Sequence, residues 1–310
     1  MDYENYMELY EALYFFRRVC TGYPVEIDIE KPQRIDGDVK LGMRIEGHVW
    51  QAILRILVVN QLLAYEAPHY KLTEENIERQ QNIFRSVIDK SDKTQYEALY
   101  EKAIDSEYFF FDNITEEEYE LYSRCDFEVT YGIGKRISSC LNLSGKSVLE
   151  LGGNSGGLAT ALLRESTNCR YTVVDTEIPC EVGESLKIEN QTEIQFVRSD
   201  IFRLKLPKQR FDCVIMMNLL HDFDDSKCLK ILKNCMDYAD QKTKFLIIED
   251  VLTSEFEPIE VIMHGMRVSV ECRGGKQRTA KELENLFSKI GYCLEMTIKI
   301  DDIHTLLVMG

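Results

Sequence analysis

The sequence predicts an α/β fold in which a doubly wound, mostly parallel sheet follows a helical amino-terminal domain. Five short apolar runs, each ending in a polar residue, alternate with helical patterns between residues 147 and 250. Such continuous apolar runs are typical of parallel strands that helices cover on both faces. Two further runs are joined only by a short turn at Asp301 and Asp302. Because this turn cannot hold a crossover helix, the final pair must be antiparallel.

The charge balance argues against two classes of partner. The chain of 310 residues has 53 acidic and 37 basic residues and a formal net charge of -16. Such a field repels the phosphates of nucleic acid and of anionic membranes unless a basic patch is segregated, so we expect neither partner. The amino terminus lacks a signal-peptide pattern, and no run reaches the roughly 18 apolar residues of a membrane span. We therefore expect a cytoplasmic protein.

The ten cysteines are scattered along the chain without a C-x-x-C pair, and several lie inside apolar runs. This distribution favours buried thiols over disulfides or metal ligands. We therefore expect no metal.

Residues 1–106 are mostly helical in pattern and are predicted to form the first domain. Within residues 48–77, an apolar helical pattern precedes two short strands around Pro68, and Thr73 opens another helix. Helix, hairpin and helix in this order indicate a winged-helix-like domain; the alternative is an ordinary helix followed by an irregular loop. Because this segment has many apolar positions and no chemistry of its own, we expect it to form a homodimer.

Residues 107–310 are predicted to form the second domain. It opens with clustered aromatic residues and a capping box from Thr115 to Glu118. The strand candidates follow in the order SVLEL, YTVVD, IQFVRSD, FDCVIMMN and KFLIIED. A last crossover helix begins at the capping box of Thr279 and Glu282 and ends at Gly291.

The segment VLELGGNSGG joins the first of these strands to a helix. Its pattern is acidic-x-G-G-x-x-G, with Glu150, Gly152, Gly153 and Gly156 at the defined positions, and it does not fit the dinucleotide pattern G-x-G-x-x-G. Glycines in such a turn let a ligand approach the main chain. The sequence therefore predicts a nucleotide-type ligand and disfavours a dehydrogenase.

Polar residues end the next two strands, at the sheet edge where open α/β folds bind ligands. Asp175 follows Gly152 by 23 residues and is placed to accept both hydroxyls of a ribose. Asp200 is placed to accept from an adenine amine, with Ile201 beside the ring. Each aspartate also has a structural interpretation: Asp175 as a cap of the following turn and Asp200 as a cap of a short helix.

His221 follows the fourth strand in the segment MMNLLHDFDD. An imidazole at this edge can take a proton at cellular pH, which makes His221 the candidate general base. The other histidines are placed elsewhere: His48 and His69 in the first domain, His264 in a helical stretch and His304 in the last strand.

Six segments together resemble the S-adenosylmethionine-dependent O-methyltransferases of the plant caffeate/isoflavone type and their bacterial relatives in natural-product pathways. They are VLELGGNSGG, VVDTEIP, RSDIF, NLLHDFDDSKCLKILKN, LIIEDVL and RGGKQRTAKELENLFSKIGY, and the match covers roughly residues 107–310. The resemblance implies a class I methyltransferase fold with a Rossmann-like sheet, an amino-terminal dimerisation domain, S-adenosylmethionine as cofactor and a role in secondary metabolism.

Carried over residue by residue, the resemblance implies two sets of site residues. The cofactor set comprises the turn of Glu150, Gly152 and Gly153 for the methionine part, Asp175 for the ribose, and Asp200 and Ile201 for the adenine. The catalytic set comprises His221 as general base and Glu249 as the acidic residue that orients it.

The chain departs from the family pattern at several positions. Asn154 stands where glycine is usual, which asparagine tolerates because it accepts left-handed backbone angles. Gln277 stands where plant members have a second acidic partner of the histidine, so one carboxylate is expected to hold His221. Met217 replaces a lysine near the adenine, and residues 20–47 match nothing in the family.

We therefore predict methyl transfer to a hydroxyl, phenolic in type, of a small aromatic molecule whose identity the sequence does not give. The aromatic residues 108–111 with Met263 and Met266 either line the acceptor pocket or belong to the core. One alternative is a relative of the same fold that methylates nitrogen, sulfur or carbon, or that catalyses decarboxylation or hydroxylation. Another is a cofactor sensor that binds DNA, which is disfavoured because residues 48–65 offer only Arg55.

Overall fold

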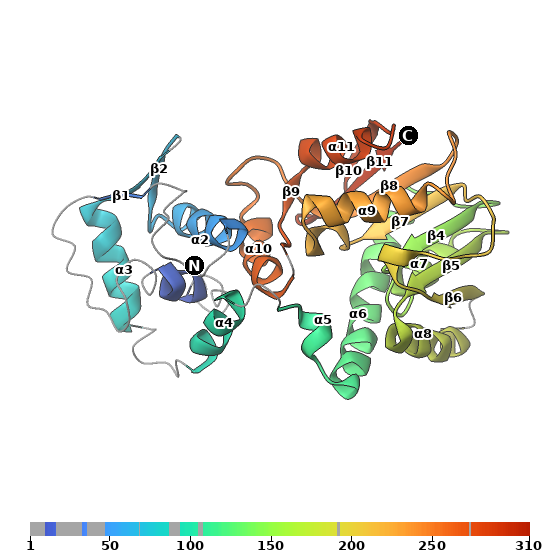
Figure 1. The fold of residues 1–310 in the computed structure, drawn as a ribbon, viewed down its shortest axis with the longest axis horizontal. Helices are drawn as coiled ribbons and strands as arrows, with labels where there is room; N and C mark the ends of the chain where they lie inside the picture. The colour runs from blue at the N-terminus through green and yellow to red at the C-terminus, as the bar shows by residue number, and fades with distance from the viewer. Residues whose placement is uncertain are drawn as a thin grey trace. The chain divides into compact units, whose positions relative to one another are not determined.

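The computed structural model divides the chain into two compact units (Figure 1). The described residues are 10–16, 33–35, 47–67, 69–86, 94–104, 108–190, 193–272 and 274–310. The first unit comprises Met1–Phe110 and Leu252–Gln277, and the second comprises Phe111–Val251 and Arg278–Gly310. The predicted domain boundary at residues 106 and 107 lies outside the described residues. The sequence did not predict that Leu252–Gln277 belongs with the first unit.

The first unit contains the predicted succession of helix, hairpin and helix. Its elements are β1 (Gln33–Ile35), α2 (Gly47–Val59), β2 (Ala64–Glu66), β3 (His69–Leu72), α3 (Glu74–Ser86), α4 (Thr94–Ile104) and α10 (Ile259–Glu271). Strand β3 pairs antiparallel with both β1 and β2. The alternative of an irregular loop after α2 is therefore wrong.

Thr73 and Asn76 fix the start of α3. The backbone N–H of Asn76 donates to Thr73 Oγ1 (3.2 Å), and the Thr73 N–H donates to Asn76 Oδ1 (3.1 Å). This reciprocal pair satisfies backbone donors that a helix start would otherwise leave open. Thr73 thus opens the helix as its sequence predicts, with asparagine in place of the acidic partner of a capping box.

The second unit is built on a sheet with the strand order β10-β11-β8-β7-β4-β5-β6. Its long strands are β4 (Ser147–Leu151), β5 (Arg170–Asp175), β6 (Ile194–Arg198), β7 (Cys213–Met217), β8 (Lys244–Leu252), β10 (Leu294–Lys299) and β11 (His304–Met309). Strands β4 to β8 pair parallel, and β11 pairs antiparallel with β8 and β10. The doubly wound sheet with an antiparallel last hairpin is confirmed.

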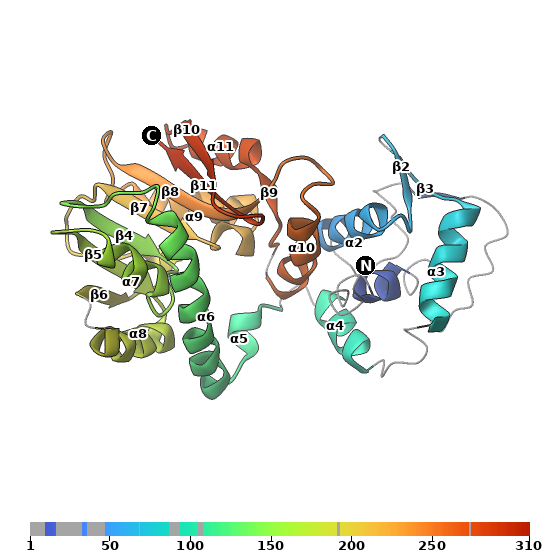
Figure 2. The ribbon, with the colours of Figure 1, turned by 180° about the vertical axis from the view of Figure 1, so that it is seen from behind.

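Helices cover both faces of this sheet. They are α6 (Glu116–Ile137), α7 (Gly157–Arg164), α8 (Glu177–Asn190), α9 (Asp225–Cys235) and α11 (Ala280–Ser288), and the short α5 (Phe110–Asn113) precedes them. Helix α9 lies in front of the sheet in Figure 1, whereas α6 and α7 lie in front of it in Figure 2. The capping boxes predicted for α6 and α11 are both present.

The order in which strands are added to the sheet reverses at β4. From β4 the chain proceeds to β5 and β6 on one side, and β7 and β8 then extend the sheet on the other. Loops that follow β4 and β7 therefore part at their carboxyl ends, and this is where open α/β sheets bind ligands.

The nine described cysteines are all free. Within the described ranges there is no cluster of His, Cys, Asp or Glu that could hold a metal ion. No helix in the described part of the chain is long and apolar enough to cross a membrane.

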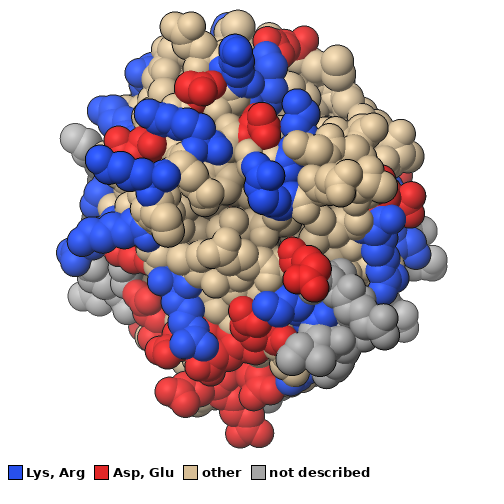
Figure 3. Space-filling view, turned by 90° about the vertical axis from the view of Figure 1, so that its right-hand side faces the viewer, with Lys and Arg blue, Asp and Glu red and all other residues tan. Residues whose placement is uncertain are grey.

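Charge is unevenly distributed on the face in Figure 3, where Lys and Arg gather in the upper part and Asp and Glu below. The expectation of no nucleic-acid partner, which rests on net charge, stays a prediction.

Candidate active site

The turn from β4 to α7 is tightly packed at its glycines. Gly152 and Asn154 have positive φ angles of 66° and 47°. A Cβ on Gly152 would lie 2.7 Å from Leu219 Cδ1, and one on Gly153 would lie 2.7 Å from Glu150 Cδ. Asn154 thus adopts the left-handed backbone that the sequence predicts, and the positive φ of Gly152 favours glycine at that position.

Three carboxyl groups lie near this turn. Glu150 is buried, at 1% exposure. Burial, together with the charges of Asp126 and Asp175, raises the pKa of Glu150 to about 8, although a hydrogen bond with Tyr171 lowers it. Burial likewise raises the pKa of Asp126, in α6, to about 7, with an added contribution from Asp175. Buried carboxyls that repel one another favour a cation beside them.

Asp175 joins the glycine turn to the end of β5. Its Oδ2 accepts a hydrogen bond from the backbone N–H of Asn154 (2.8 Å), and its Oδ1 accepts one from that of Thr176 (2.7 Å). Burial raises the pKa of Asp175, while these hydrogen bonds lower it. The carboxylate therefore supports the turn, and it also caps the following residues as the structural interpretation expects.

Asp200 is an exposed residue after β6. Its Oδ1 accepts a hydrogen bond from Phe202 N (2.7 Å), so it caps the short 3-10 helix η3 (Ile201–Arg203). The Nδ2 of Asn234 donates to the carbonyl of Ile201 (3.0 Å) and attaches this segment to α9. The structure thus shows the capping interaction, and the adenine contacts of Asp200 and Ile201 stay predictions.

His221 lies on the 3-10 helix η4 (Leu220–Asp222), close after β7, and its Nδ1 is 3.0 Å from Oε2 of Glu249. The other carboxylate oxygen of Glu249 accepts from the backbone N–H groups of Leu219 (3.2 Å) and Leu220 (2.8 Å). Glu249 therefore fixes both the imidazole and the loop that carries it. It lies inside β8, three residues before the end of the strand, where the sequence placed it at the end.

The imidazole of His221 is buried and surrounded by acidic groups. Burial lowers its pKa, but the charge and hydrogen bonding of Glu249, with the charges of Asp222 and Asp250, raise the pKa to about 9. Asp222 Oδ1 is 3.5 Å from His221 Nε2. The expectation that one carboxylate holds the histidine is therefore wrong, because Asp222 supplies a second one from the adjacent position.

Arg278 is a site residue that the sequence patterns did not predict. It is 3% exposed and donates to the carbonyls of Leu220 (2.8 Å) and Phe223 (2.7 Å) and to Asp225 Oδ1 (2.8 Å). These contacts clamp both ends of the loop that contains His221. The only signal in the sequence is an arginine directly before the capping box of α11.

Several other positions singled out in the sequence are buried. Met266 is completely buried, so it belongs to the core of the first unit, and Met263 Sδ lies 3.9 Å from Asn60 Nδ2. Met217 is buried in β7. Gln277 is buried in the first unit, where its side chain packs against Gly265. Of residues 20–47, only β1 and the beginning of α2 are described.

The chain belongs to the O-methyltransferase domain family, whose model matches residues 84–293. Among curated relatives, it is 29% identical over 161 residues to norreticuline-7-O-methyltransferase of Papaver somniferum, covering 50% of this chain and 43% of that protein. It is 28% identical over 162 residues to acetylserotonin O-methyltransferase of Gallus gallus, covering 51% of this chain and 46% of that protein. The matches thus span less than half the length of these relatives. The resemblance drawn from the sequence is confirmed.

Solved structures of this class share the fold. The O-methyltransferase family 2 protein from Planctomyces limnophilus, in complex with apigenin, has a TM-score of 0.78 at 16% identity, covering 97% of this chain and 92% of that chain. Human N-acetylserotonin methyltransferase, in complex with SAM, has a TM-score of 0.60 at 20% identity with the same coverage. The predicted class I methyltransferase fold is thereby confirmed.

Proposed function

We propose that this protein transfers a methyl group from S-adenosylmethionine to a phenolic hydroxyl of a small aromatic molecule. The observation that carries the proposal is the buried His221–Glu249 pair beside the glycine turn. Leu219, two residues before the histidine, is the residue against which a Cβ on Gly152 would collide. A proton acceptor and a nucleotide-type turn thus meet at the carboxyl ends of adjacent strands.

The residues around the turn fit a cationic cofactor. S-adenosylmethionine has an ammonium and a sulfonium group, and the buried carboxyl of Glu150 lies near the carboxyls of Asp126 and Asp175. Opposite charge at this position favours the ionised carboxylates and offsets their burial. When bound, the cofactor supplies an activated methyl group. We propose that Gly152, Gly153 and Glu150 hold its methionine part, Asp175 its ribose, and Asp200 with Ile201 its adenine.

The His221–Glu249 pair suits the removal of a proton from a phenol. We propose that Nε2 of His221 takes the hydroxyl proton while Glu249 holds Nδ1 and stabilises the imidazolium. The pKa of His221, about 9, is close to that of a phenol, about 10 by analogy with tyrosine. Proton transfer between groups of similar pKa has a small free-energy change, which favours concerted transfer as the new bond forms.

We expect the rate to rise with pH through the range from 7 to about 9, because His221 must lose its proton to act as a base. Glu249→Gln removes the charge that raises this pKa. The rise of the rate with pH should therefore occur at lower pH, and the maximal rate should fall. The measurement is kcat/KM between pH 6 and pH 10. Asp302→Asn, at a largely exposed carboxylate, is the control and should keep the wild-type profile. A rise at the same pH in Glu249→Gln as in the parent would contradict the assignment.

Asp175→Ala should weaken S-adenosylmethionine binding by about 1 to 3 kcal/mol, because it leaves hydrogen-bonding groups of the ligand and of Asn154 unsatisfied. Titration calorimetry measures this change. Asp175→Asn, which keeps an acceptor for the Asn154 N–H (2.8 Å in the parent), separates support of the turn from recognition of the ribose. Tight binding of a nicotinamide cofactor by the parent protein, or unchanged affinity in both variants, would refute the cofactor assignment.

We also propose that the first domain, residues 1–106, is winged-helix-like and forms a homodimer. The antiparallel hairpin of β2 and β3 between α2 and α3 supports the first part. Sedimentation velocity of the full chain tests the second and should give the mass of two chains. A monomer at micromolar concentration would contradict it. The cytoplasmic location and a role in secondary metabolism stay predictions.

A further inference from the structure

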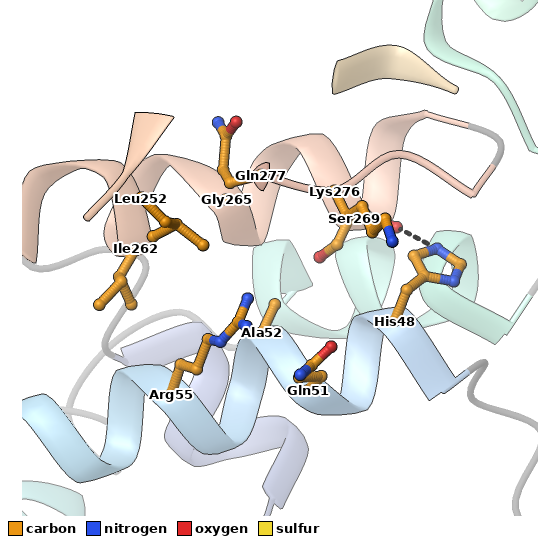
Figure 4. A pocket seen from close by; sticks show the side chains of 10 residues that line it. All are labelled: His48, Gln51, Ala52, Arg55, Leu252, Ile262, Gly265, Ser269, Lys276 and Gln277. Atoms are coloured by element: carbon orange, nitrogen blue, oxygen red, sulfur yellow. Dashed lines mark hydrogen bonds between the residues drawn. The ribbon is translucent and has the colours of Figure 1, made fainter. Parts of the chain in front are cut away.

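A small hollow, partly open to solvent, lies between α2 and α10 inside the first unit. Basic and amide side chains from α2 and from residues 276–277 line it, together with Ser269 and a few apolar groups (Figure 4). No aspartate or glutamate is among the described residues that line it. In a chain with a formal net charge of -16, such a lining is unusual.

Arg55 is the central residue of this hollow. Its side chain points from α2 toward α10 in Figure 4. The Nε atom is buried and has no hydrogen-bond partner among the described residues. The nearby acidic residue is Glu255, whose charge raises the pKa of Tyr70 while that of Arg55 lowers it. The carboxylate of Glu255 accepts a hydrogen bond from the Tyr65 hydroxyl (3.4 Å). A guanidinium fork with an unsatisfied buried donor favours an oxyanion as partner.

The neighbouring groups define which oxyanion fits. Nε2 of His48 lies 3.1 Å from the carbonyl oxygen of Ser269, which can only accept, so His48 donates this bond and its ring is fixed at the wall. Lys276 adds a second positive charge. Leu252 and Ile262 lie at the opposite end of the hollow in Figure 4 and form an apolar wall. Arg55 lies between this apolar wall and the end that His48 and Lys276 occupy (Figure 4), an arrangement that matches a planar carboxylate on a small apolar body.

We propose that this hollow binds a small carboxylate-bearing molecule, with Arg55 holding the carboxylate and Leu252 and Ile262 in contact with its apolar body. The site goes beyond the proposed methyl transfer, because all its residues belong to the first unit and its occupation requires neither the cofactor nor His221. It also gives a role to Arg55, which is too isolated a cation in α2 to serve in DNA binding.

Titration calorimetry of the full chain with benzoate, benzamide and inorganic phosphate tests the proposal without any activity measurement. Benzoate should bind with a Kd of about 1 mM or below, within the range for a ligand of this size. Benzamide, which has the same shape without the charge, should bind at least about tenfold more weakly, and so should phosphate, which lacks the apolar body.

Arg55→Gln should weaken benzoate binding at least about tenfold by removal of the charged donor. Arg79→Gln is the matched control, because Arg79 is an exposed helical arginine of α3 that pairs with Glu75 (3.8 Å) away from the hollow. If Arg55→Gln does not fold, by circular dichroism, the comparison of benzoate with benzamide on the parent protein still decides. Equal binding of benzoate and benzamide, phosphate binding as tight as benzoate, unchanged affinity in folded Arg55→Gln, or no benzoate binding would each overturn the proposal.

Discussion

Replacing His221 with alanine should lower turnover by about 10²- to 10⁴-fold, the usual contribution of a positioned base. The affinity for S-adenosylmethionine should remain nearly unchanged, since the proposed cofactor groups lie on the glycine turn and on the ends of β5 and β6. Saturating cofactor and a panel of phenols give kcat, and calorimetry gives the cofactor Kd. A lower kcat with an unchanged cofactor Kd marks loss of an interaction made in the transition state.

Glu249→Gln is the natural comparison for His221→Ala. It should cause a smaller loss with the same signature, because the imidazole remains but loses the carboxylate 3.0 Å from Nδ1. If His221→Ala methylates its acceptor at the wild-type rate, the protein acts by alignment alone or on an acceptor that is already ionised. A thiol acceptor, or another of the alternatives within the same fold, would then account better for the activity.

Replacing Arg278 with methionine should destabilise the second unit by roughly 2 to 5 kcal/mol, because two buried carbonyls, those of Leu220 and Phe223, lose a charged donor. Methionine keeps most of the apolar stem, so the change tests the hydrogen bonds. Urea unfolding, followed by circular dichroism, measures the free energy. Turnover should also fall, since the loop that holds His221 loses its clamp.

Asp225→Asn distinguishes the contribution of the Arg278–Asp225 ion pair to stability from that of the hydrogen bonds between Arg278 and the two carbonyls. The side chain of Asp225 is 52% exposed, so its pairing with Arg278 contributes at most about 1 kcal/mol, as solvent-screened pairs do. The asparagine variant should therefore remain close to the parent in stability. Unfolding of Arg278→Met at the same urea concentration as the parent would show that water replaces the lost donor at both carbonyls.

The parallel sheet and the glycine turn were predictable because their patterns are local. Continuous apolar runs specify strands buried on both faces, and the positive φ of Gly152 favours glycine in the turn. The sequence pattern predicts too short a strand β8 for a related reason. Its apolar run resumes at Val251 and Leu252 after two buried acidic residues, and the sequence pattern alone favoured an end at those residues.

The tertiary partners of the site were not predictable in the same way. The Arg278 guanidinium reaches backbone carbonyls 55 and 58 residues earlier in the chain, and backbone acceptors leave no trace in side-chain patterns. Asp126 lies in a helix rich in acidic residues, and only the packing of α6 beside the turn distinguishes it from its exposed neighbours. Likewise, only three-dimensional packing assigns residues 252–277 to the first unit.

We expect cofactor binding beside the buried carboxyls at the turn to be coupled to the release of protons. Burial raises the pKa of Glu150 from 4.5 to about 8 and that of Asp126 from 3.8 to about 7, so both bind protons more tightly when the chain is folded. The stability that this proton binding contributes is present below the unfolded pKa values and is lost as pH rises through 7 and 8. A cation bound among these groups should displace their protons into the solvent. Its affinity therefore increases with pH over the interval in which the empty site becomes less stable.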